Sequence, residues 1–199
     1  MKKILARAGG LFIIMTLLCG LIYTLVITGI GQVIFPYQAN GSVIKVGDKT
    51  YGSELLAQQF TEDKYLWGRV ISPDTGSFAD ADGNPVMYAW ASNASPASPD
   101  YEATIAERVD AMRASNPDRG DAPVPVDLVT CSGSGLDPEI SPAAAEYQVP
   151  RIAKDRGISE DEVRSAIDAA SKGKFLGVFG EPTVNVLKVN LILDGILEG

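Results

Sequence analysis

An apolar run without a single charged residue extends from Leu11 to Phe35. At about 1.5 Å per residue, a helix over this run measures roughly 37 Å, which exceeds the ~30 Å hydrocarbon core of a bilayer. A cleaved signal peptide would have an apolar stretch of only about 7–15 residues, followed by an Ala-x-Ala-like site. No such site follows here. The run therefore predicts one transmembrane helix that anchors the chain without being removed.

The charges that flank this helix predict its orientation. Lys2, Lys3 and Arg7 precede it with no acidic residue among them, and basic flanks remain on the cytoplasmic side of a membrane. We therefore expect residues 1–10 to form a short cytoplasmic tail, residues 11–35 to cross the cell membrane once, and residues 36–199 to form an extracytoplasmic domain.

The part of the chain beyond the helix is acidic. Without the three basic residues of the tail, 14 basic residues stand against 25 acidic ones, a net charge of about −11. Nucleic-acid binding needs a basic patch to meet the phosphates, so nucleic acid is excluded as a partner. Membrane lipid around the helix is the expected contact of the anchor, and the acidic surface favours solubility.

Two residue types limit the chemistry. The chain contains no histidine, which excludes Ser-His-Asp and Cys-His catalysis and histidine-ligated metals. Its two cysteines are Cys19, inside the apolar run, and Cys131, in the predicted domain. They are expected on different sides of the membrane boundary and cannot pair, so the domain must rely on its core or on neighbours for stability.

The first half of the domain predicts a hairpin and two helices. Residues 42–46 and 49–51 flank Gly47-Asp48 as in a β-hairpin, Ser53 begins a helical spacing that runs to Phe60, and residues 101–116 show an amphipathic helical spacing. The segment 72–100 is rich in Ser, Pro, Gly and Asp and is expected to be irregular. Asp80, Asp82 and Asn84 alternate there as in a calcium loop, but the terminal Glu is missing.

The second half adds strands around two further helices. Residues 123–130 predict a strand. Ser159 with Glu162 forms a capping box at the start of a helix, and the alternation over 182–193 is typical of a half-buried strand. Together the elements predict an α+β (mixed α/β) domain with few strands, anchored by a single N-terminal transmembrane helix.

Small residues and turn formers gather in the run CSGSGLDPEIS, which begins at Cys131. It lacks the lysine of a phosphate loop and the third glycine of a dinucleotide fingerprint, and no histidine is present to activate Ser134. Three interpretations stay open: a tight turn before a helix capped by Ser141, a backbone nest for an anion or carbonyl, or an acid–base or cation pair formed by Asp137 and Glu139. Pro150 is expected to kink or break the helix that follows, with a second piece ending at Gly157.

These motifs, in this order, resemble the C subunit of the bacterial Kdp potassium-transporting ATPase, and the resemblance covers nearly the whole chain. The stretches that carry it are SGSGLDPEISPAAAEYQVPRIAKDRG with PVPVDLVT ahead of it, Gly52-Ser53 with Gln58 and Phe60, the segment 65–69, and GVFGEPTVNVLKVNL. Glu139 departs from the family, which usually carries His or Asn at this position.

The resemblance implies a non-catalytic subunit of a high-affinity, ATP-driven potassium uptake complex. Its implied partners are a channel-like potassium-binding subunit, a P-type subunit that hydrolyses ATP, and a small membrane peptide. It further implies a catalytic chaperone that raises the ATP affinity of the ATP-hydrolysing subunit, with Ser134, Gln148 and Arg151 as nucleotide or partner contacts. No catalytic residue, metal or cofactor of its own is implied, and potassium is the transported ion.

The charge-based topology and the implied ATP contact point in different directions, because ATP is cytoplasmic and the domain is expected outside. Stabilising the assembly or covering the ion entrance agrees better with an acidic exterior domain. Two alternatives remain, a membrane-anchored hydrolase that uses Asp137 and Glu139 and a free-standing extracytoplasmic ligand-binding module.

Overall fold

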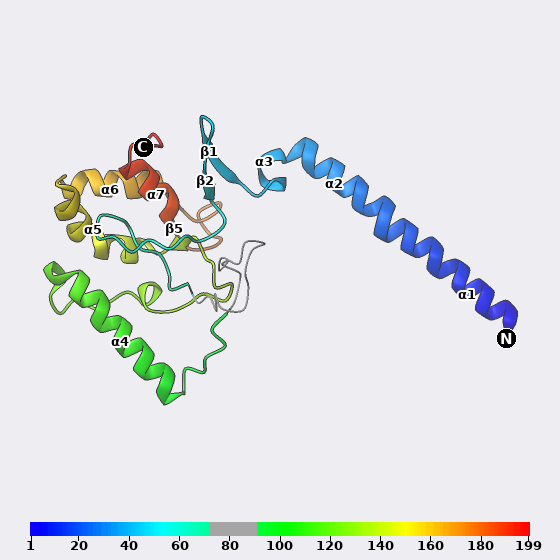
Figure 1. Ribbon diagram of the computed structural model, residues 1–199, viewed down its shortest axis with the longest axis horizontal. Coiled ribbons are helices and arrows are strands. Elements are labelled where there is room, and N and C mark those ends of the chain that lie inside the picture. The colour runs from blue at the N-terminus through cyan, green and yellow to red at the C-terminus, as the bar shows by residue number, and fades with distance from the viewer. Residues whose placement is uncertain (72–90) are drawn as a thin grey trace, which may run out of the picture. The chain divides into compact units, whose positions relative to one another are not determined.

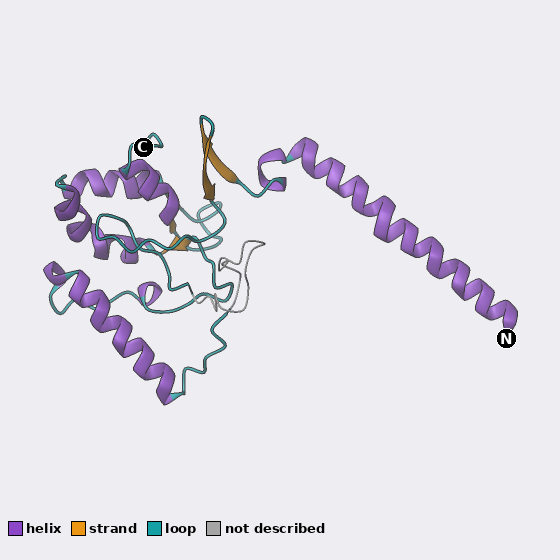
Figure 2. Cartoon of the chain, in the orientation of Figure 1, coloured by secondary structure: helices purple, strands orange, loops and turns teal. Residues whose placement is uncertain are grey.

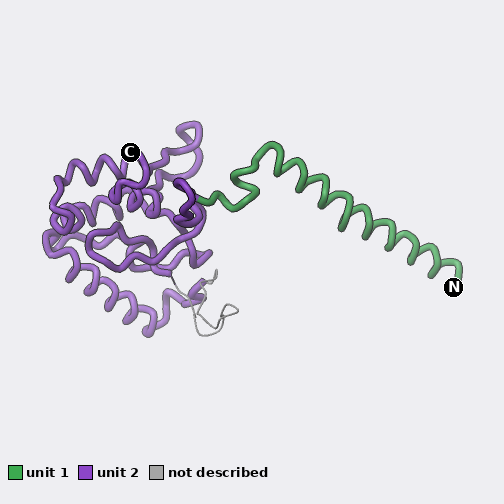
Figure 3. The backbone as a smooth tube through the Cα atoms, turned by 45° about the horizontal axis from the view of Figure 1, so that its top comes forward, with its two compact units in different colours: residues 1–43 green, residues 44–199 purple. Residues whose placement is uncertain are grey.

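A computed structural model describes residues 1–71 and 91–199 of the chain. The chain divides into two compact units, residues 1–43 and residues 44–199 (Figure 3). Most of the segment expected to be irregular, including Asp80, Asp82 and Asn84, lies outside the described residues.

The first unit is built on one long helix over Lys2–Ile34, which contains α1 (Lys2–Met15), a π-helical stretch (Thr16–Ile22) and α2 (Tyr23–Ile34). The helix is long and apolar enough to cross a membrane. Helix α3 (Pro36–Ala39) follows. The predicted anchor is therefore helical, and the helix also includes nearly all of the predicted tail.

The second unit begins with the predicted hairpin, formed by β1 (Val43–Val46) and β2 (Lys49–Ser53). The helix expected from Ser53 to Phe60 is wrong, because only a turn forms there. Ala57 donates its N–H to the carbonyl of Leu136, and the Gln58 carboxamide donates to the carbonyl of Tyr51. These contacts with residues outside the segment replace the helix, which its local spacing could not reveal.

Helix α4 (Pro99–Ser115) confirms the predicted amphipathic helix, and a 3-10 turn, η2 (Pro117–Arg119), follows it. The strand expected over 123–130 is wrong, since its centre is a second 3-10 turn, η3 (Val126–Leu128). Prolines at 123 and 125 have no N–H to donate to a neighbouring strand. The hydroxyl and N–H of Thr130 instead donate to the carbonyl of Val126.

Helices α5 (Pro142–Arg156) and α6 (Glu160–Ala169) begin where their caps predict. The Ser141 hydroxyl accepts from the N–H of Ala144, and Ser159 and Glu162 form both hydrogen bonds of a capping box. Gly157 ends α5 in the left-handed conformation, at φ 65°. Here local side-chain chemistry was sufficient to place three helix ends.

Of the kink or break expected at Pro150, the break does not occur, because α5 continues through Pro150 as one helix to Arg156. A proline at this position removes the N–H that would bond the carbonyl of Glu146. Arg119 supplies replacement donors: its guanidinium donates to the carbonyl of Glu146 and, at 2.8 Å, to the carbonyl of Tyr147. A side chain from η2 thus satisfies the backbone that Pro150 leaves open, and the helix continues to Arg156.

A three-stranded antiparallel sheet, in the order β3-β5-β4, completes the unit with β3 (Glu139–Ile140), β4 (Ser171–Lys172) and β5 (Thr183–Asn185). The strand expected over 182–193 is correct only at its start. Asn185 ends β5 and caps helix α7 (Val186–Leu193), its side chain accepting from the N–H of Lys188 at 3.0 Å. The α+β class is therefore confirmed.

The core of the second unit lies between α5, α6, α7 and the sheet (Figures 1 and 2). In Figure 1, α6 and α7 lie on one side of α5 and α4 lies on the other. The residues that are fully excluded from solvent are mostly aliphatic: Leu66, Ile140, Ile152, Val149, Val163, Val184 and Val189, together with Gln148, Asn185 and Asn190.

Replacing Arg119 by alanine should lower the free energy of unfolding by about 2–3 kcal/mol, because two carbonyls lose a charged donor. The loss should shrink by about 1 kcal/mol in a Pro150→Ala background, where residue 150 regains an N–H for Glu146. Urea unfolding, followed by far-UV circular dichroism, measures the free energy of unfolding of the unmodified chain, the two single variants and the double variant. Equal losses in both backgrounds would show that Arg119 does not substitute for the missing N–H.

Glu146 also joins α5 to α6, since Arg164 donates to its two carboxylate oxygens at 3.1 and 3.0 Å. These hydrogen bonds hold the pKa of Glu146 below its usual value, against the opposing effect of partial burial. A lowered folded-state pKa adds stability above the unfolded pKa of about 4.3, and this stability is lost as the pH falls through the folded value.

Glu146→Gln should therefore flatten the fall of unfolding free energy between about pH 5 and pH 3. Denaturant titrations at several pH values test this, with Glu107→Gln, an exposed position on α4, as the matched control. An unchanged pH profile in Glu146→Gln, or an equal flattening in the control, would contradict the assignment.

Candidate functional site

Residues 62–71 cross the second unit without a helix or a strand. They begin with a turn in which Tyr65 donates to the carbonyl of Glu62, and Val70 forms an isolated bridge with Cys131. The carboxamide of Asn190, from α7, bonds both backbone groups of Leu66 on this segment. Its Oδ1 accepts from the N–H of Leu66 at 2.8 Å, and its Nδ2 donates to the carbonyl of Leu66 at 2.9 Å. A single side chain thus replaces the neighbouring strand that Leu66 lacks.

Gln148, from α5, repeats this arrangement at the next residue. Its Oε1 accepts from the N–H of Trp67 at 2.9 Å, and its Nε2 donates to the carbonyl of Trp67 at 2.9 Å and to that of Ala144 at 3.2 Å. Gln148 is fully excluded from solvent. We call residues 62–71 the clamped segment, because two carboxamides hold its centre against α5 and α7.

Arg151 lies one turn further along α5 and faces the same segment. It donates to Gln148 Oε1 at 2.6 Å and to the carbonyl of Asp63, and its guanidinium lies 4.0 Å from the centre of the Trp67 ring. Burial lowers the pKa of Arg151 to about 10, so the side chain keeps its charge at neutral pH. Of the three family-implied residues, Gln148 and Arg151 are therefore brought together, and both bind the chain's own backbone.

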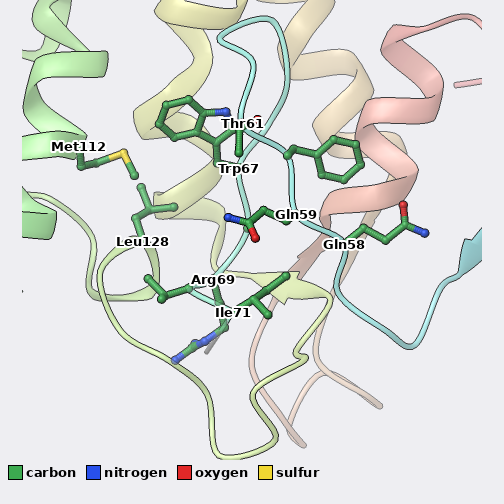
Figure 4. Close-up of a pocket in the computed structure, with 11 residues that line it drawn as sticks. Gln58, Gln59, Thr61, Trp67, Arg69, Ile71, Met112 and Leu128 are labelled. Carbon is green, nitrogen blue, oxygen red and sulfur yellow. The ribbon is translucent and has the colours of Figure 1, made fainter. Parts of the chain in front are cut away.

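The clamped segment also forms one wall of a cavity of about 260 Å³ (Figure 4). Met112 and Leu128 lie on one side of this cavity, Arg69 and Ile71 lie below, and the carboxamide of Gln58 points away from it. The remaining lining residues come from the segment before and around Trp67: Gln59, Phe60, Thr61, Trp67, Gly68 and Val70. The cavity is mainly apolar and has one cationic group at its edge.

That group, Arg69, connects the cavity to the run CSGSGLDPEIS, residues 131–141, which we call the Ser-Gly corner. It donates to Asp127 Oδ1 at 3.1 Å, and its Nε lies 3.8 Å from Asp137 Oδ2. Asp127 also accepts, through Oδ2, from the N–H of Ser141 at 2.8 Å. Arg69 Nε is buried without a hydrogen-bond partner among the described residues, and its contact with Asp137 is an ion pair at 3.8 Å.

The corner itself is a tight turn. Gly135 donates to the Ser132 hydroxyl at 3.0 Å, Leu136 donates to the Ser134 hydroxyl at 3.2 Å, and the two hydroxyls lie 3.1 Å apart. Of the three interpretations left open by the sequence, the turn before a capped helix describes this local geometry. Ser134 is exposed, and its hydroxyl bonds only within the corner among the described residues, so the three family-implied residues do not form one cluster.

Asp137 and Glu139 face different basic partners. Asp137 pairs with Arg69, and its Oδ1 accepts from the N–H of Glu139 at 3.0 Å, while the Glu139 carboxylate lies 3.6 Å from Lys172 Nζ. Their side chains are thus used separately, one at the corner and one across the sheet. Within residues 1–71 and 91–199, no group of three or more acidic, cysteine or histidine side chains is placed to hold a metal ion.

Sequence reasoning missed Asn190 and Arg69. Asn190 lies within the strand predicted over residues 182–193, and Arg69 ends the segment 65–69, which was noted only for the family resemblance. The available signal was local: Asn185 and Asn190 lie in a run that is mostly aliphatic, and buried carboxamides in such a run need partners elsewhere in the fold.

The fold thus defines a chain with one apolar N-terminal helix and one α+β unit. The protein-family model described as K+-transporting ATPase, c chain (KdpC) matches residues 5–195. Similar curated proteins carry the name potassium-transporting ATPase KdpC subunit. One from Clostridium botulinum strain Eklund 17B is 55% identical over 99% of this chain and 98% of its own length. Another from Sorangium cellulosum is 48% identical over 93% of this chain and 94% of its own. The chain therefore belongs to the KdpC family.

Asn190→Leu should lower the free energy of unfolding by about 2–5 kcal/mol, because it leaves two buried backbone groups of Leu66 without partners. Leucine is close to asparagine in size, so loss of hydrogen bonding should dominate. The matched control is Gln59→Leu, an exposed amide at the cavity, which should change stability by less than about 0.5 kcal/mol. Equal losses for both variants in urea unfolding would refute the clamp.

Proposed function

We propose that this chain is an accessory subunit of an ATP-driven potassium uptake complex and that it stabilises the assembly from the extracytoplasmic side. The family and the names of similar proteins support a potassium pump as the setting of this chain. The apolar helix supports a single-pass anchor in the cell membrane. Lys2, Lys3 and Arg7 before that helix support a cytoplasmic N-terminus.

One observation carries the non-catalytic role. Gln148 and Arg151 are buried, and their polar atoms bond Trp67, Asp63 and Asn116. Residues used in this way position the clamped segment and have no free groups for a substrate. The proposed partners are a channel-like potassium-binding subunit, a P-type ATP-hydrolysing subunit and a small membrane peptide.

We further propose that the chain raises the ATP affinity of the ATP-hydrolysing subunit indirectly. ATP is cytoplasmic, whereas the basic N-terminal flank favours an exterior second unit. The effect then passes through the membrane-embedded partners by favouring one of their conformations. Ser134 is the family-implied residue whose exposure suits a direct contact with a partner.

A ligand-binding module is the second candidate function, and the cavity beside Arg69 favours it. Its apolar lining and the cationic side chain of Arg69 at its edge suit a small ligand with an apolar body and an acceptor group. In the assembly role, the same cavity suits a side chain of a partner.

The orientation is tested by proteolysis of the complex in sealed membrane vesicles of known sidedness. Protease on the extracytoplasmic face should cleave the second unit, while protease on the cytoplasmic face should leave it intact. Lysis of the vesicles with detergent provides the control for accessibility. Cleavage of the intact vesicles from the cytoplasmic face would reverse the topology and restore direct ATP contact.

The assembly role predicts that the chain co-purifies with a P-type ATPase and a multispan membrane protein. Deleting the chain should reduce recovery of that complex and growth at low potassium concentration, and re-expression should restore both. Recovery of an intact, active pump without the chain would overturn the proposal.

A further inference from the structure

The connection between β4 and β5, residues 173–182, presents apolar side chains to solvent. We call it the Phe175 loop. Phe175, Leu176, Val178 and Phe179 are 71%, 76%, 74% and 63% exposed. In the described part of the second unit, no other connection exposes four large apolar side chains; Leu55 and Leu56, after β2, are exposed as a pair. Contiguous apolar groups of this kind mark interaction sites.

The loop is closed by its own backbone. Phe175 donates to the carbonyl of Phe179 at 2.8 Å, Phe179 donates back at 3.0 Å, and Val178 donates to the carbonyl of Phe175 at 3.2 Å. Lys174 and Glu181 form an ion pair of 3.2 Å at its base. The side chains therefore project from a preformed turn, which reduces the entropy lost on binding.

Backbone conformation reinforces this shape. Leu176 has φ 53°, a left-handed value that is unfavourable for a residue with a Cβ. Gly177, at φ 75°, follows it. A turn that holds a leucine in this conformation and in water has the signature of a functional site more than of a passive connection.

The base of the loop is rigid. Ser171 and Lys172 of β4 pair with Val184 and Thr183 of β5, and Val184 is fully excluded from solvent. The sheet therefore fixes both ends of the loop to the second unit, while residues 173–182 themselves are exposed.

The charges favour a protein over a lipid surface. Lipid-binding tips use free basic residues to meet anionic headgroups. Here Lys172 is paired with Glu139 and Lys174 with Glu181, at 3.6 and 3.2 Å. The chain beyond the anchor carries about −11, which an anionic bilayer would repel. The loop contains neither Trp nor Tyr, the aromatic residues typical of a membrane interface.

We propose that the Phe175 loop inserts its apolar tip into a socket on the extracytoplasmic surface of another, membrane-embedded subunit of the pump. This inference rests on the proposed function, which places the chain in such a complex. The anchor tethers the second unit to the same membrane as that partner. Two phenylalanines on a rigid turn match the aromatic anchors that dominate protein interfaces.

The first test places a photo-crosslinking phenylalanine analogue at Phe179 in the full chain, within membranes that contain the whole pump. Irradiation should link the chain to a multispan subunit. The matched control carries the same analogue at Val126, an apolar residue that is 64% exposed on η3. Equal yields at both positions, or a product with phospholipid alone, would overturn the inference.

The second test is the double variant Phe175→Ser/Phe179→Ser. The hydrogen bonds that close the loop are between backbone groups, and both rings are exposed, so its thermal midpoint should match that of the unmodified chain. Loss of the chain from the purified, detergent-solubilised pump should become about tenfold faster or more. An unchanged loss rate in a folded variant would contradict the inference, and for a misfolded variant the crosslinking result decides.

The two proposals fail in different ways. If the unmodified chain purifies with the ATPase but position 179 forms no specific crosslink, the loop inference fails and the assembly role stands. If the unmodified chain does not purify with the ATPase at all, the assembly role itself fails.

Discussion

The second unit depends on satisfying the backbone of one segment that belongs to no sheet. Leu66 is fully buried, and a buried peptide group without a partner is costly. Asn190 and Gln148 solve this by presenting carboxamides, which have the same donor and acceptor as a peptide, to Leu66 and Trp67. Helices α5 and α7 must therefore keep their distance and rotation for the segment to stay in place. The packing of α5 and α7 and the path of the clamped segment therefore depend on each other.

The same arrangement positions the cavity and the Ser-Gly corner. Arg69 follows Trp67 on the clamped segment and pairs with Asp127, which in turn accepts the N–H of Ser141 at the start of α5. The Ser-Gly corner resembles a phosphate loop in composition, but it serves as the connection between η3 and the capped start of α5. Its charged neighbours link the corner to the cavity wall. This use of the carboxylates explains why acid–base chemistry finds little support in the geometry.

The sequence predicted those features that local chemistry decides. Ser141, Ser159 and Gly157 mark helix ends, because a cap acts within a few residues. The strand expected at 123–130 was wrong, and the strand expected at 182–193 was correct only over Thr183–Asn185. Alternation of apolar residues does not separate a strand from a short buried helix. Gln148 and Arg151 were identified only through resemblance, and the fold gives them a structural context that spacing could not reveal. Asn190 and Arg69 were missed, since their partners lie far away in the chain.

The π-helical stretch in the first unit has a consequence for how this chain meets other helices. A π turn holds more residues than an α turn, so the stretch Thr16–Ile22 rotates the side-chain rows of α2 relative to those of α1. One additional residue corresponds to a rotation of about 100°. In a uniform α-helix, residues spaced by about 3.6 positions share one face. Here such residues of α1 and α2 lie on different faces, because the π-helical stretch separates them. A straight neighbouring helix would contact one set of side chains near Lys2 and another near Ile34, which allows two neighbours to share this one helix.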